Sequence, residues 1–168
     1  SMLRALAAMR ERIAQREAHI TRLAYVDTLT DLPNRTRFVE RFEQLPSHSG
    51  ALLLLDIDRF SAINKALGHA VGDALLLGVA DRLRAAITDN DVLARLWADE
   101  FALLLCSADP AQAQAIAEKI RAALREPLDI NGQRLDLEAS IGIAIFPADG
   151  TDLPLLLRRA DTALRSAK

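Results

Sequence analysis

The N-terminal segment carries apolar residues at alternating steps of four and three. The series comprises Met2, Leu6, Met9, Ile13, Ile20 and Leu23, with the charged Arg16 in the same register. This a/d spacing predicts a helix with one apolar seam, which is typical of a parallel coiled coil between two copies of a chain. An amphipathic helix packed on its own domain would show the same spacing, so both alternatives stay open.

Beyond this seam the pattern alternates between short apolar runs and helical segments. A continuous apolar run from Ala51 to Ile57 predicts a buried strand, and two runs joined by Trp97-Ala98-Asp99-Glu100 predict a β-hairpin. Further strands are expected on both sides of Asn131-Gly132, which is a typical tight turn, and over 135–146. Helices are expected over 36–45, 71–87, 110–125 and 153–167. A further helical segment is expected after the first strand and its acids, ending at residue 67.

This order of elements predicts an α/β fold of the α+β type. One central, mainly antiparallel sheet would be flanked by helices, as in the ferredoxin-like split βαβ arrangement. We expect residues 1–26 to form a linker helix and 27–168 to form one domain.

The charge and the hydropathy of the sequence exclude some classes of function. The net charge is −2 and the 21 basic residues form no dense cluster, which argues against a nucleic-acid polymer as partner. No apolar stretch approaches the roughly 20 residues that span a bilayer, and no signal-peptide pattern is present, so we expect a cytoplasmic domain. Both ends of the sequence suggest a piece of a longer protein, which could itself be anchored to a membrane.

Four carboxylates follow apolar runs. Asp56 and Asp58 end the first predicted strand, while Asp99 and Glu100 lie in the predicted hairpin. If these strands are neighbours, the acids meet at one end of the sheet, where they repel each other unless a proton or a cation intervenes. Hard oxygen ligands suit Mg²⁺, so a magnesium site is one interpretation. Solvated acids at strand ends are the other.

Five motifs together resemble the GGDEF (diguanylate cyclase) domain, in the same order and with similar spacing. They are DTLTDLPNR at 27–35, DIDRFSAINKALGHAVGD at 56–73, RLWADEF at 95–101, SIGIAIFP at 140–147 and ADTALRSAK at 160–168. The resemblance covers residues 25–168 and implies a nucleotidyl-cyclase-type fold. It also implies GTP as the ancestral substrate and the condensation of two GTP molecules into cyclic di-GMP.

The resemblance assigns roles to individual residues. Asp56, Glu100 and the carbonyl of Ile57 match the metal ligands, and Asp99 and Glu100 are the signature acids, here interpreted as vestigial. Asn64 and Asp73 match the pair that reads guanine, and Lys168 matches a lysine that contacts phosphate. Asp27 and Arg35 are expected to form an ion pair across the loop that follows the linker helix.

The sequence departs from the family pattern at several positions. Trp97 and Ala98 replace the two signature glycines, and Ser61 replaces a phosphate-contacting lysine. An indole at position 97 should occupy the space of the nucleotide, or else close an exposed notch as an apolar side chain. Thr88 replaces the arginine of the RxxD product-inhibition motif, so no inhibitory site is expected.

These observations favour a degenerate GGDEF domain without cyclase activity that works as a regulatory and dimerisation module. The partners expected are a second copy through the N-terminal helix, and adjacent sensor and phosphodiesterase (EAL) domains in the full-length protein. Three alternatives remain: a GTP-binding sensor with Mg²⁺, a weakly active cyclase, and an interaction domain whose acids are relics.

Overall fold

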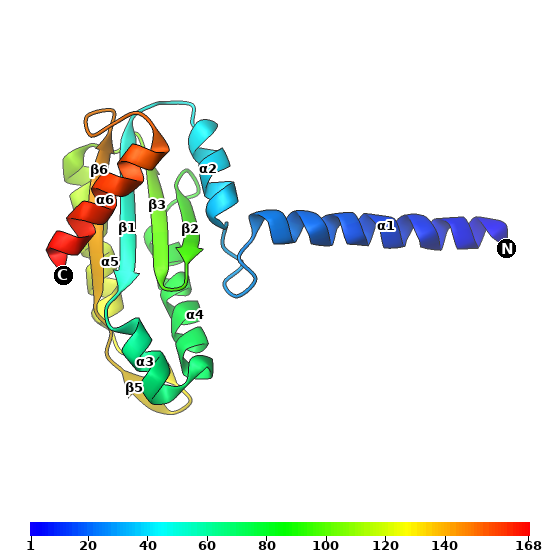
Figure 1. Cartoon of the computed structure of the whole chain (residues 1–168), viewed down its shortest axis with the longest axis horizontal. Coiled ribbons are helices and arrows are strands. Elements are labelled where there is room, and N and C mark those ends of the chain that lie inside the picture. The colour runs from blue at the N-terminus through cyan, green and yellow to red at the C-terminus, as the bar shows by residue number, and fades with distance from the viewer.

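The computed structural model describes residues 1–168 as one long helix followed by an α/β domain (Figure 1). The helices are α1 Met2–Tyr25, α2 Arg35–Glu43, α3 Phe60–Leu67, α4 His69–Ala86, α5 Pro110–Arg125 and α6 Leu153–Ala167. The strands are β1 Gly50–Ile57, β2 Val92–Trp97, β3 Glu100–Cys106, β4 Leu128–Ile130, β5 Gln133–Leu135 and β6 Ala139–Phe146.

The central sheet has four strands in the order β2-β3-β1-β6, and every neighbouring pair is antiparallel. β1 lies inside the sheet, where Leu53 faces Leu103 of β3 on one side and Ile143 of β6 on the other. The crossover through α3 and α4 carries the chain from β1 to the edge strand β2. This order and these pairings confirm the predicted ferredoxin-like, mainly antiparallel arrangement.

Helices cover both faces of the sheet, which explains why β1 reads as an unbroken apolar run. Leu53 and Leu55 pack with α4 and α5 in the larger core. Leu52 and Leu54 point to the opposite face and pack with α2 and α6 in a second core. In Figure 1, α6 crosses in front of the sheet and α4 and α5 lie behind it.

Helix α1 projects away from the domain (Figure 1) and has no buried residue. The apolar residues of its seam are 49–79% exposed. This exposure shows that the alternative in which the helix packs on its own domain is wrong. The two faces of the sheet are instead covered by α4 and α5 on one side and by α2 and α6 on the other. Pairing with a second copy stays a prediction. None of the helices combines the length and the apolar character needed to cross a membrane.

The strand predicted over 135–146 is divided in the structure. Leu135 ends β5, which pairs with β4 in a separate two-stranded sheet, whereas β6 begins at Ala139 and pairs with β1. Asp136 and Glu138 lie between the two strands, and Leu137 is buried in the larger core. Alternation of polar and apolar residues across this link made it look like a continuous strand.

Candidate functional site

The candidate site lies where β1 ends beside the turn between β2 and β3. Asp56 of β1 stands opposite Glu100 of β3 in the antiparallel register, and Ala98 and Asp99 form the two-residue turn before Glu100. The backbone N–H of Ile57 donates to the carbonyl of Asp99 at 3.4 Å, which ties the turn to the end of β1. The structure thus brings Asp56, Asp99 and Glu100 together, as the sequence predicted.

These acids share an unfavourable electrostatic environment. Burial, a hydrogen bond with Asp56 and repulsion by Asp56 raise the pKa of Asp99 to about 7. Burial and the charges of Asp56 and Asp161 likewise raise the pKa of Glu100. Negative charge is therefore concentrated here beyond what neighbouring cations offset, which is common at functional sites.

The cation nearest to these acids is Lys168. Its Nζ donates to Oδ2 of Asp56 at 2.7 Å, and the lysine side chain is 43% exposed. This hydrogen bond, together with the charges of Asp56, Asp58 and Asp99, raises the pKa of Lys168. Asp58 is held differently, because its Oδ1 accepts a hydrogen bond from the Ser140 hydroxyl at 2.8 Å.

The expected magnesium ligands are Asp56, Glu100 and the carbonyl of Ile57. No group of three or more histidine, cysteine, aspartate or glutamate side chains surrounds a single point. The expected set includes only two carboxylates, so this finding does not bear on it. Asp99 and Glu100, whose pKa values are raised by burial and by the charge of Asp56, lie with Asp56 in a cluster of acids that suits a hard divalent cation, which would relieve their repulsion.

The two residues expected to read guanine lie on consecutive helices. Asn64 is half-buried on α3, and its Oδ1 is buried without a hydrogen-bond partner. Gly72 of α4 packs against this atom so closely that a Cβ at position 72 would lie 1.8 Å from it. Asp73 is exposed on α4, and Ser61 is exposed in the first turn of α3.

The two positions that replace the signature glycines are the last residue of β2 and the first residue of the turn that follows it. Neither Trp97 nor Ala98 has a positive φ, so the backbone here does not require glycine. Trp97 is 62% exposed, and the Arg35 guanidinium lies 5.6 Å from the centre of its ring. The interpretation of Trp97 as an apolar side chain that closes a notch is therefore wrong. Its indole stands at the tip of the hairpin in a cation–π contact.

Arg95, to which the sequence reasoning gave no role, holds the loop after α1. Its Nη1 lies 3.0 Å from both carboxylate oxygens of Asp27, while its Nε and Nη2 donate to the Ala98 carbonyl at 2.9 and 2.7 Å. The expected ion pair between Asp27 and Arg35 is therefore wrong, because Arg35 contacts Trp97 instead. A charged residue within the apolar strand β2 was the signal that could have identified Arg95.

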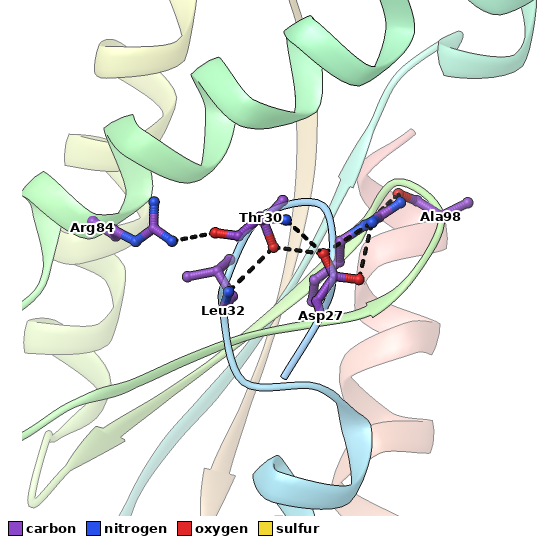
Figure 2. A network of polar contacts seen from close by, with 6 residues as sticks. Asp27, Thr30, Leu32, Arg84 and Ala98 are labelled. Carbon is purple, nitrogen blue, oxygen red and sulfur yellow. Dashed lines mark hydrogen bonds and ion pairs between the residues drawn. The ribbon is translucent and has the colours of Figure 1, made fainter. Parts of the chain in front are cut away.

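The same carboxylate is bound from its own loop (Figure 2). The backbone N–H and the hydroxyl of Thr30 donate to Asp27 at 2.9 and 2.7 Å, and Arg84 donates to the Thr30 carbonyl. Burial opposes the charge of Asp27, but these hydrogen bonds and Arg95 outweigh it and lower the pKa of Asp27. Asp27 is thus a compensated charge.

The segment expected to lack the product-inhibition site forms a closed turn. The backbone N–H and the hydroxyl of Thr88 donate to Oδ2 of Asp91 at 3.2 and 3.1 Å. The backbone N–H of Cys106 donates to the other oxygen of Asp91 at 3.4 Å. Asp91, the acid that remains of the RxxD motif, therefore stabilises the local structure.

An antiparallel sheet of this order, with acids at the end of β1 and in the adjoining turn, defines a nucleotidyl-cyclase-type domain. The family model "Diguanylate cyclase, GGDEF domain" matches residues 24–168, and the chain belongs to this family. It is a GGDEF domain of cyclic di-GMP signalling proteins.

Three comparisons illustrate the relationship. The chain is 40% identical over 162 residues to the bifunctional diguanylate cyclase/cyclic di-GMP phosphodiesterase MucR of Pseudomonas aeruginosa, covering 93% of this chain but only 24% of MucR. The GGDEF domain of TpbB (YfiN) from Pseudomonas aeruginosa superposes with a TM-score of 0.81 at 39% identity, covering 86% of this chain and 88% of that one. The coiled coil and GGDEF domain of DgcB from Caulobacter crescentus, in complex with c-di-GMP, gives a TM-score of 0.82 at 26% identity, covering 98% and 91%.

Proposed function

We propose that this chain is a regulatory and dimerisation module of a cyclic di-GMP signalling protein and has no cyclase activity. The observation that carries the proposal is Trp97, whose exposed indole stands at the tip of the hairpin directly before Ala98, Asp99 and Glu100. A large ring at this position takes space that a nucleotide would need beside the acids. Misplacing reacting groups by about 1 Å costs on the order of a hundredfold in rate.

The charges around the acids support the same conclusion. Lys168, which the family resemblance assigns to phosphate, binds Asp56 here. Ser61 offers no cation where the family has a lysine. A triphosphate would therefore meet fewer positive charges than the family pattern supplies, which weakens its binding.

Two kinds of partner are proposed. The exposed seam of α1 suggests a second copy of the chain, and the greater length of the relatives suggests adjacent domains in the same protein. The exposed seam of α1 suits a second copy, because pairing would bury its apolar side chains in a parallel coiled coil. MucR is named as a bifunctional cyclase and phosphodiesterase and is about four times as long as the matched region. We therefore place this module in the cytoplasm beside a sensor domain and an EAL-type domain.

The decisive experiment incubates the chain with GTP and Mg²⁺ and measures cyclic di-GMP by chromatography. The expected result is no product. Synthesis that Glu100→Gln abolishes would overturn the proposal and make the chain a weakly active cyclase. A double variant, Trp97→Gly with Ala98→Gly, tests the cause of inactivity: a gain in turnover is expected if the indole is the obstacle, and no gain would refute this mechanism.

A second candidate function is a GTP-binding sensor. It is favoured by Asn64 and Asp73, which the family resemblance assigns to guanine and which lie on the consecutive helices α3 and α4. Calorimetric titration with GTP in the presence of Mg²⁺ tests it, with Asp73→Ala as the control. Heat that the control abolishes supports the sensor. Absence of heat at millimolar nucleotide leaves a domain that works through its surface and α1.

A further inference from the structure

The seam of α1 gives each of its residues a place in a heptad. The a positions hold Leu6, Ile13 and Ile20, and the d positions hold Met2, Met9, Arg16 and Leu23. Isoleucine at a with leucine at d favours a pair of parallel helices. Because α1 projects away from the domain (Figure 1) and buries none of its residues, the whole seam is open to a second copy. Arg16 is the one charged residue within this seam.

Three charged residues at the middle of the seam lack an opposite charge in their own chain. Arg12, Arg16 and Glu17 take part in none of the ion pairs of the structure. Arg12 and Arg16 lie four residues apart, so they are neighbours of like charge on the helix surface. The positions three and four residues away from Glu17 hold Ile13, Ala14, Ile20 and Thr21. An opposite charge can therefore reach this stretch only from another chain.

A parallel pair in register brings these charges together. Position g of one helix lies beside position e of the next heptad on the other helix, which places Arg12 beside Glu17 of the partner subunit. A side chain at d packs beside the d and e positions of the facing helix, so Arg16 reaches the same carboxylate. The other g–e contacts oppose no like charges, since they join Ala5 to Arg10 and His19 to Ala24.

A staggered pair loses this match. A stagger of one heptad sets one Arg12 against Arg10 of the facing helix and the other Arg12 against Ala24. It also sets each Arg16 against an apolar d residue, Met9 or Leu23, with no acid at the adjoining e position. A guanidinium that enters an apolar seam without an acid is costly. The charges thus favour one register over its staggered neighbours.

We propose that Arg12, Arg16 and Glu17 form a charged layer between two copies of this chain, in which each Glu17 receives both arginines of the partner subunit. The layer sets the orientation and register of the pair, while the apolar seam supplies the attraction. This inference rests on the dimerisation part of the proposed function and deepens it, because it names the residues that decide how two copies meet. A helix without an acid at the same e position would pair less well, so the layer also selects the partner.

Charge exchange tests the layer, with the dissociation constant of the pair measured by sedimentation equilibrium of the whole chain. Glu17→Arg replaces attraction by repulsion and is expected to raise this constant by about tenfold. Adding Arg12→Glu restores an opposite pair and should return the constant to within about threefold of the parent value. The matched control adds Arg10→Glu instead and has the same net charge. Because Arg10 faces Ala5 in the parallel pair, this control should restore nothing.

Two results would overturn the layer while leaving dimerisation intact. One is a dissociation constant that Glu17→Arg leaves unchanged. The other is rescue by Arg10→Glu in place of Arg12→Glu, which would indicate an antiparallel pair, because e positions face each other there. A chain that stays monomeric up to about 1 mM would overturn the layer together with the dimerisation module. Cyclic di-GMP synthesis would overturn the proposed inactivity without affecting the layer, so the failures are distinguishable.

Discussion

Two groups of charges lie close together at the same end of this domain and are treated in opposite ways. At the base of α1, Asp27 receives hydrogen bonds from Thr30 and Arg95, and its pKa is lowered. At the end of β1, Asp99 and Glu100 lie near Asp56, and the pKa of each is raised. The two groups are close in sequence as well, because β2, which carries Arg95, ends at Trp97, and only Ala98 lies between Trp97 and Asp99.

The difference separates a structural role from a candidate functional one. Compensated charge lowers the free energy of the folded state and fixes one geometry, as expected of a junction. Uncompensated charge raises the free energy of the folded state, and such local conflicts are expected where a ligand or a cation later resolves them. The acids of this chain thus keep the electrostatic character of a binding site even though Trp97 stands beside them.

Breaking the compensated group should have the largest effect. Arg95→Ala leaves the Asp27 carboxylate and the Ala98 carbonyl without their donors in a weakly exposed setting. We expect the free energy of unfolding, measured by urea denaturation, to fall by about 3 kcal/mol.

A matched control is an ion pair between α1 and the same loop. Arg22 pairs with Asp31, but both side chains are more than half exposed. Arg22→Ala should therefore change the free energy of unfolding by no more than about 0.5 kcal/mol. Equal effects of the two substitutions would contradict the distinction between the compensated junction and an ordinary surface pair.

Removing charge from the uncompensated group should stabilise the protein. The pKa of Asp99 is raised from 3.8 to about 7, so between these values the folded protein holds a proton that the unfolded chain has released. Stability therefore falls as the pH rises from about 4 to about 7 and changes little above that range. Asp99→Asn should raise the free energy of unfolding at pH 8 by on the order of 1 kcal/mol, after allowance for partial exposure to solvent.

Urea denaturation at several pH values checks this prediction. The substitution should flatten the decline between about pH 4 and 7, because the neutral amide cannot titrate. Asp89→Asn, at an exposed position outside the site, is the control and should leave the pH dependence unchanged. A destabilised Asp99→Asn protein at pH 8 would show that the aspartate charge is compensated after all.

Most of the fold was predictable because local signals were strong. Helix α5 was expected over 110–125 and observed there, since Asp109 forms a capping box with Gln112 and Pro110 occupies the first turn. The hairpin at Ala98-Asp99 followed from two apolar runs joined by a short polar segment, and the hairpin at Asn131-Gly132 followed from turn chemistry. The division of 135–146 into two strands was missed, because the partner of each strand is set by tertiary contacts that periodicity does not reveal.

The candidate site was predictable only in part, for a similar reason. Register between strands follows from apolar patterning, so the meeting of Asp56 with Glu100 could be inferred. The choice between Arg35 and Arg95 as the partner of Asp27 could not, because it depends on how the loop after α1 docks on β2 through the Pro33 carbonyl. The contact of Lys168 with Asp56 likewise joins residues that lie 112 positions apart.

The smallest effect is expected at Lys168, which forms the one ion pair of Asp56 and so partly compensates the acids at the end of β1. A divalent cation that binds Asp56 must displace this ammonium, and a half-exposed ion pair of this kind contributes at most about 1 kcal/mol. Lys168→Met should therefore tighten binding of Mn²⁺, used as a probe for Mg²⁺ and followed by electron paramagnetic resonance of the free ion, by up to about fivefold. Lys119→Met, at an exposed position on α5, should leave the affinity unchanged. Weaker binding in Lys168→Met would mean that the lysine supports the cation site instead of competing for it.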